Sequence, residues 1–166
     1  MDPRSFPRTR EWSDRVGGWD LRQYIVNNIE VSDAVVMGSL FWPGFIERDG
    51  AVFVDFMFDD AVYGQWLVQT GGDVQAMEKV LNHLHLWDVL DPKSDQEYAT
   101  IPELARKIAG TWRMSASASF PSREFSVEIS DEPEDYGPTI MIYTIKLLRG
   151  LCETPICGKG ELCLEL

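Results

Sequence analysis

The stretch from Phe41 to Phe58, FWPGFIERDGAVFVDFMF, constrains the fold of this chain more than any other. Two apolar runs flank a charged turn at 47–50. Asp49-Gly50 is a favoured hairpin turn because both central positions of a type I′ turn need positive φ. The second run, Ala51 to Phe58, contains one polar residue, Asp55. This pattern predicts a β-hairpin whose second strand is buried on both faces.

Helical patterns lie on both sides of this hairpin. Apolar residues recur at helical spacing. Asp20 and Thr100 are suitable N-cap residues for two of the expected helices. Residues 91–98 are polar and indicate a loop. We therefore expect helices at residues 20–29, 32–40, 59–69, 74–90 and 100–119.

A second hairpin is expected towards the carboxyl end of the chain. Residues 124–130 alternate between apolar and polar side chains, as in a strand with one solvated face. An acidic turn at 131–138 separates them from another strand pattern at 139–148. The whole predicts an α+β fold with about four mainly antiparallel strands in two hairpins. We expect the strands to form one sheet, with the helices packed largely on one face.

The length of 166 residues suits one domain. We assign residues 19–149 to a single α+β domain, residues 1–18 to a flexible N-terminal arm and residues 150–166 to an irregular tail. Three cysteines lie in this tail: Cys152, Cys157 and Cys163. They include no Cys-x-x-Cys pair and have no histidine nearby, so we expect free thiols and no structural zinc site.

The charge is strongly acidic and unevenly spread. The formal net charge is −12, and between Asp33 and Glu97 twelve carboxylates outnumber three basic side chains. Such a body repels nucleic acid and anionic lipid; it suits a basic protein partner, or it serves solubility alone. The N-terminus lacks a signal-peptide pattern, and no apolar run approaches the roughly 20 residues that span a bilayer. We expect a cytoplasmic protein that binds neither nucleic acid nor membranes.

One set of residues suggests a metal or ligand site. Asp55 lies within an apolar strand pattern, and a buried carboxylate needs donors, a metal or exposure. Asp59 and Asp60 follow shortly after, and with His85 they define the alternative prediction, a small metal- or ligand-binding enzyme. The sequence contains no phosphate-binding loop and no nucleophile elbow. The main prediction is therefore a protein without catalytic activity or cofactor.

The two histidines, His83 and His85, fall within the expected helix at 74–90. In a helix their rings point in widely different directions. On an extended segment they would share a face, and a carboxylate such as Asp88 could complete a metal site with them. The helical pattern favours packing histidines.

Two surface features favour protein binding. One is the aromatic group before the first hairpin turn, and the other is the acidic loop with its adjacent strand face. Exposed aromatics anchor partners and charges steer them, whereas the simpler interpretation is a core aromatic group beside a solvated loop. The predicted function is an interaction protein of immunity (toxin-neutralising) or adaptor type. The predicted partner-binding residues are Phe41, Trp42, Phe45, Glu47, Glu124, Glu128, Asp131, Glu132, Glu134 and Asp135.

Overall fold

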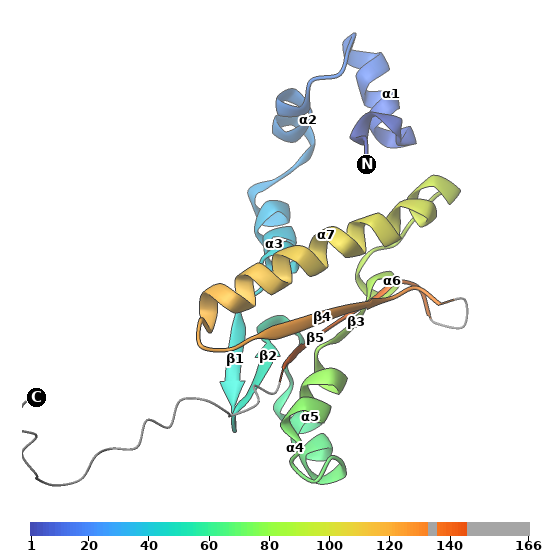
Figure 1. Cartoon of the computed structure of the whole chain (residues 1–166). Helices are drawn as coiled ribbons and strands as arrows, with labels where there is room; N and C mark the ends of the chain where they lie inside the picture. Colours follow the sequence, from blue (N-terminus) through green and yellow to red (C-terminus); the bar gives the residue numbers. More distant parts are fainter. Residues whose placement is uncertain (133–135, 146–166) are drawn as a thin grey trace, which may run out of the picture.

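The computed structural model describes residues 1–132 and 136–145 (Figure 1). The α-helices are α1 (Pro7–Val16), α2 (Leu21–Asn28), α3 (Val31–Phe41), α4 (Asp60–Gln69), α5 (Val74–Leu81), α6 (Leu86–Val89) and α7 (Asp95–Ser119). The strands are β1 (Phe45–Arg48), β2 (Ala51–Val54), β3 (His83–His85), β4 (Phe125–Ser130) and β5 (Thr139–Thr144). Two short 3₁₀ helices, η1 (Pro3–Ser5) and η2 (Asp55–Met57), complete the described elements. The α+β class is confirmed.

The first predicted hairpin is present and has the predicted turn. Strands β1 and β2 pair antiparallel, and Asp49 and Gly50 between them have φ values of 50° and 84°. All residues of β2 are buried, which confirms a strand covered on both faces. The strand is shorter than the apolar run, because the chain turns into η2 at Asp55.

The second predicted hairpin, β4–β5, is also present, but it belongs to a separate sheet. Within the described residues the sheets are β1-β2 and β3-β5-β4, with antiparallel pairing throughout, so the expected single four-stranded sheet is wrong. The extra strand β3 comes from the segment predicted as helix to residue 90. Helix α5 stops at Leu81 because Asn82 leaves the helical conformation and binds other strands through its side chain. Tertiary pairing here overrides local helical periodicity.

Helix α7 begins earlier than predicted. Its N-cap is Ser94, whose hydroxyl accepts a hydrogen bond from the backbone N–H of Glu97 at 3.3 Å. The expected start signal around Thr100 therefore lies inside the helix, as does Pro102. The loop predicted at residues 91–98 therefore extends only to Ser94, the N-cap of α7. The predicted end before Pro121 is confirmed, since the helix ends at Ser119.

The main core lies between α7 and the sheet β3-β5-β4, which α7 crosses in Figure 1. Trp112 of α7 is fully buried, and its indole N–H donates to the carbonyl of Leu40 at 2.7 Å. The neighbouring Ser115 hydroxyl donates to the carbonyl of Pro43 at 2.8 Å. These two bonds fix the end of α3, and therefore the start of the first hairpin, against α7. A second, smaller core lies between β2 and helices α4 and α5.

The segment predicted as a flexible arm contains helix α1. Trp12 of α1 is buried, and its ring lies edge-on to Trp19 and to Tyr24 of α2, with centroid separations of 6.0 and 5.2 Å. This aromatic group ties α1 to α2 above α7 (Figure 1). No helix was predicted around Trp12.

Candidate functional site

The aromatic half of the predicted partner surface is only partly exposed. Phe41 and Phe45 are half-buried and pack against the main core. Trp42, between them, has 53% of its surface exposed. The structure therefore leaves one of these three aromatic side chains available as an anchor.

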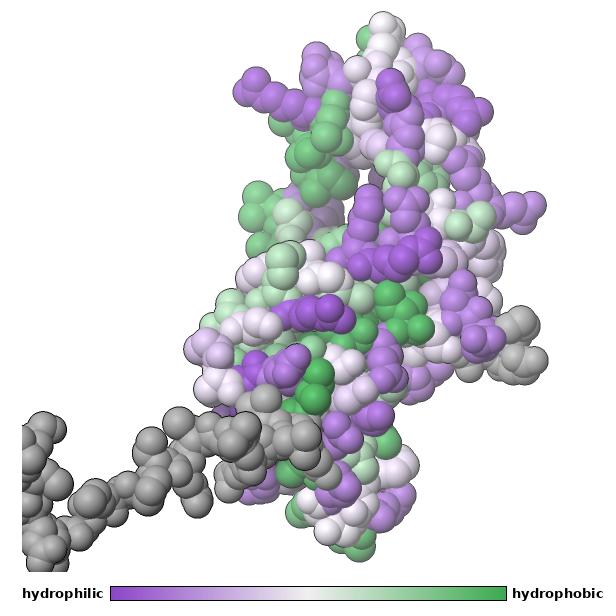
Figure 2. Space-filling model, in the orientation of Figure 1, coloured by the Kyte–Doolittle hydropathy of each residue, from purple (hydrophilic) through white to green (hydrophobic). Residues whose placement is uncertain are grey.

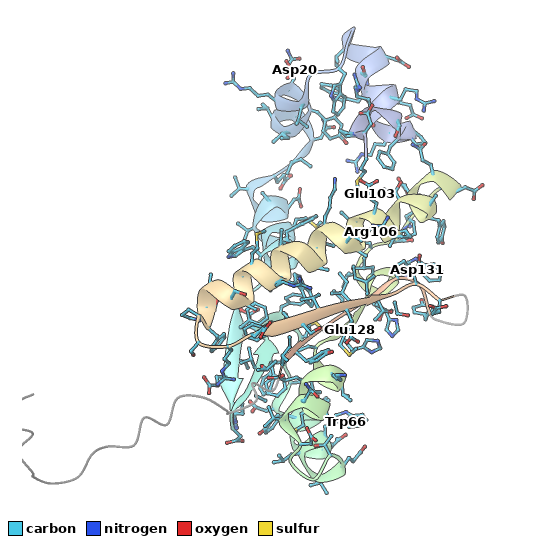
Figure 3. All side chains as sticks on the ribbon, in the orientation of Figure 1. Asp20, Trp66, Glu103, Arg106, Glu128 and Asp131 are labelled. Atoms are coloured by element: carbon cyan, nitrogen blue, oxygen red, sulfur yellow. The ribbon has the colours of Figure 1, made fainter. Side chains whose placement is uncertain are left out.

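The acidic half of the predicted surface lies along β4. Glu124, Glu128, Asp131 and Glu132 are exposed, and Figure 3 shows Glu128 on the strand and Asp131 beyond its end. The Glu128 carboxylate accepts a hydrogen bond from the Tyr143 hydroxyl of β5. Two further predicted residues of the loop, at positions 134 and 135, lie outside the described residues.

Glu47 reaches this acidic strand through an ion pair. Its carboxylate lies 2.6 Å from the guanidinium of Arg123, the residue directly before Glu124. Arg123 also donates to the carbonyl of Gly50 in the hairpin turn at 2.8 Å. The turn of the first sheet is thus joined to the start of β4. Of the predicted residues, Glu47 is held in place and the four carboxylates of β4 and its loop remain exposed.

One apolar surface was not predicted. Helices α2 and α3 and their connection expose a set of apolar side chains, which we call the α2–α3 apolar surface: Leu21, Ile25, Val26, Ile29, Val31, Val35, Val36 and Met37. Figure 2 shows hydrophobic residues gathered over these two helices. The exposed fraction reaches 83% at Val31 and 75% at Val26. The helical period was visible in the sequence, but it indicates an apolar face without saying whether the protein itself covers that face.

The alternative metal site is not assembled. Asp55 is exposed, Asp59 caps α4 by accepting from two backbone N–H groups, and Asp60 lies 3.2 Å from Arg48. His85 lies in the other sheet, where it pairs with Thr139. Among the described residues, no group of three or more His, Cys, Asp or Glu side chains could hold a metal ion. The exposure of Asp55 removes the main reason for expecting a ligand there.

A buried polar pair at the C-terminal end of α5 was also missed. Glu78 and Asn82 are almost fully buried. The Glu78 carboxylate accepts hydrogen bonds from the backbone N–H of Val52 at 2.7 Å and of Thr144 at 2.6 Å. Burial raises the pKa of Glu78 above its usual range, and these donors oppose the shift. Both oxygens are occupied by structural bonds, so this carboxylate joins strands and is not a catalytic base.

Comparison with protein-family models, with curated proteins and with solved structures found no significant match for this chain. Among the described residues, no helix is both long and apolar enough to cross a membrane. The function must therefore be argued from the surfaces described above.

Proposed function

We propose that this chain is a non-catalytic cytoplasmic interaction protein that binds a basic protein, as an immunity protein or an adaptor does. The observation that carries the proposal is the α2–α3 apolar surface on a chain of net charge −12. Soluble monomers rarely expose contiguous apolar patches beyond a few hundred Å² unless those patches bind something. Covering such a surface with a partner removes apolar area from water, which makes binding favourable.

The charge of the chain favours a basic partner over a second copy. Two copies would each bring a charge of −12, and this repulsion opposes self-association. The exposed carboxylates of β4 and its loop supply a field that attracts a positively charged protein. In this account the apolar side chains provide most of the affinity, while the carboxylates increase the association rate and exclude acidic competitors. The same field disfavours nucleic acid.

The test is affinity capture with the full chain. Immobilised protein is incubated with a lysate of the source organism at low and at high salt, and the retained proteins are identified by mass spectrometry. We expect one dominant basic protein whose retention falls at high salt, because salt screens exposed charges. Absence of any retained basic protein at low salt would contradict the proposal.

A matched pair of variants locates the electrostatic contribution. The first variant removes the exposed carboxylates of β4 and its loop: Glu124→Gln, Glu128→Gln, Asp131→Asn and Glu132→Gln. The control removes the same charge elsewhere: Glu11→Gln, Asp14→Asn, Asp55→Asn and Asp60→Asn. Retention should fall in the first variant and change less in the control. Equal losses would mean that net charge alone, and not this surface, attracts the partner.

The immunity form of the proposal has its own readout. If the captured protein is toxic when produced alone, co-production of this chain should restore growth of the host cells. If the captured protein is harmless, the adaptor form remains and the immunity form is wrong.

A further inference from the structure

His83 and His85 lie side by side because β3 is a strand. Residues two apart in a strand point to the same face of the sheet. Their ring centroids are 4.6 Å apart, with the ring planes inclined by 60°. The sequence pattern had placed these rings in a helix, pointing away from each other. The early end of α5 at Leu81 therefore creates the pair.

A neighbouring hydroxyl contacts one ring. Thr139 lies opposite His85 on β5, and its Oγ is 2.9 Å from Nδ1 of His85. The same hydroxyl lies 3.2 Å from the carbonyl of Gly137, to which it can donate its proton. When it does so, Thr139 Oγ accepts the hydrogen bond from Nδ1–H of His85. In the neutral ring this leaves the lone pair on Nε2, which is the arrangement of a metal-binding imidazole with a supporting outer partner.

The support behind this hydroxyl is rigid. Thr139 has 3% of its surface exposed. Gly137 has a φ of 72°, and a side chain at this position would collide with the ring of Trp87. Packing by Trp87 and the backbone at Gly137 therefore hold the carbonyl that takes the Thr139 proton. Thr139 is therefore held in place beside His85.

His83, but not His85, lines a small hollow on the solvated side of the sheet. This hollow has a volume of about 100 Å³, and His83, Thr139, Met141 and Glu128 contribute to its lining. Two imidazoles that share one tetrahedral ion at about 2.0–2.1 Å per metal–nitrogen bond have ring centroids about 5 Å apart. The observed separation is close to that value. The hollow offers room for water molecules beside His83.

We propose that His83 and His85 form a surface binding site for a divalent transition-metal ion of the zinc, nickel and copper class. Imidazole nitrogen suits these ions, whereas magnesium and calcium prefer oxygen ligands. Two protein ligands with solvent completing the shell make an exchangeable site rather than a closed structural one. The site does not use the α2–α3 apolar surface, and it shares with the proposed partner surface only Glu128, which lines the same hollow.

The experiment is titration of the full chain with zinc chloride, followed by calorimetry. Because thiols also bind zinc, the titration uses a background carrying Cys152→Ser, Cys157→Ser and Cys163→Ser. The proposal expects one ion per chain, and His83→Gln or His85→Gln should weaken binding by at least about tenfold. Glu11→Gln, an exposed change on α1, is the matched control and should bind zinc as the background does. Magnesium chloride should give no binding.

Thr139 acts as a positioning residue and has a separate readout. Nitrogen NMR of the His85 ring should show Nδ1 protonated and Nε2 unprotonated in the background protein. Thr139→Val should remove this tautomer preference and weaken zinc binding by about tenfold. Zinc binding that is absent in the background, or unchanged in His85→Gln, would overturn the site. An unchanged tautomer in Thr139→Val would overturn the positioning role.

Discussion

Glu78 of α5 and Asn82, the residue that ends this helix, bind β2 and β5 from the gap between the two sheets. The Glu78 carboxylate accepts from Val52 of β2 and from Thr144 of β5. The Asn82 amide donates to the carbonyl of Val52 at 2.8 Å and to that of Ile142 at 3.1 Å. In an antiparallel pair, alternate residues direct their backbone groups away from the partner strand. These two side chains satisfy those outward groups, as a further strand would.

Breaking this junction should be costly. Asn82→Asp removes both amide donors and places a carboxylate beside two carbonyl oxygens in a buried position. We expect the free energy of unfolding to fall by about 3 kcal/mol, because buried polar groups lose their partners. Asn27→Asp is the control, since Asn27 is exposed on α2, and it should change stability by less than about 0.5 kcal/mol. Urea unfolding of both variants measures the difference. Similar values for the two would show that Asn82 does not join the sheets.

The pKa of Glu78 predicts a particular pH dependence of stability. Burial raises this pKa in the folded protein above its ordinary value of 4.5, so the folded state holds the proton more tightly than the unfolded state. The contribution of this group is therefore greatest at or below pH 4.5 and falls as pH rises through the folded pKa. Glu78→Gln should lower stability at every pH, because an amide has one acceptor oxygen for donors on both sides.

The variant should also remove the slope that Glu78 contributes. Unfolding measured over a pH series separates the pH-independent loss of unfolding free energy from the loss of its pH dependence. Glu103→Gln serves as the control and should keep the Glu78 slope. Hydrogen bonding to the N-terminal ammonium lowers the pKa of Glu103, which gives a contribution of opposite sign. A Glu78→Gln protein with an unchanged pH profile would contradict the assignment.

Pro102 should weaken helix α7. It lies inside the helix, where it cannot donate to the carbonyl of Tyr98 and its ring crowds that carbonyl. Pro102→Ala should raise the free energy of unfolding by about 1–3 kcal/mol. The greater conformational entropy of alanine in the unfolded chain offsets part of this gain. Pro121→Ala, beyond the end of the helix, is the comparison and should not stabilise. Thermal unfolding of the two proteins decides between these results.

The parts of the fold that are set by residues close together in the sequence were predictable. The turn at Asp49-Gly50, the buried strand after it and the alternating strand β4 all follow from local pattern. The end of α5 did not, because Asn82 leaves the helix for hydrogen-bond partners at Val52 and Ile142, which are far away in the sequence. Local rules contain no information about such partners.

The candidate surfaces show the same division. Exposure of the β4 carboxylates follows from strand alternation, and it was predicted. The sequence also shows that α2 has an apolar face, but burial of that face depends on whether another element of the chain reaches it. In the structure, only the C-terminal end of α3, at Leu40, reaches α7. The side chains of Val31, Val35 and Val36 earlier in α3 stay exposed. His83 and His85 likewise share a face only because β3 is a strand, which the local pattern did not predict.

The α2–α3 apolar surface is tested most directly by the affinity for the captured basic protein. Four isosteric changes make the surface polar without altering side-chain shape: Val26→Thr, Val31→Thr, Val35→Thr and Val36→Thr. The control, Val62→Thr with Val68→Thr, changes exposed valines of α4, where Val68 is 81% exposed. Calorimetric titration should show at least about tenfold weaker binding for the first variant and wild-type affinity for the control. Equal affinities for all three proteins would contradict the proposal that this surface binds the partner.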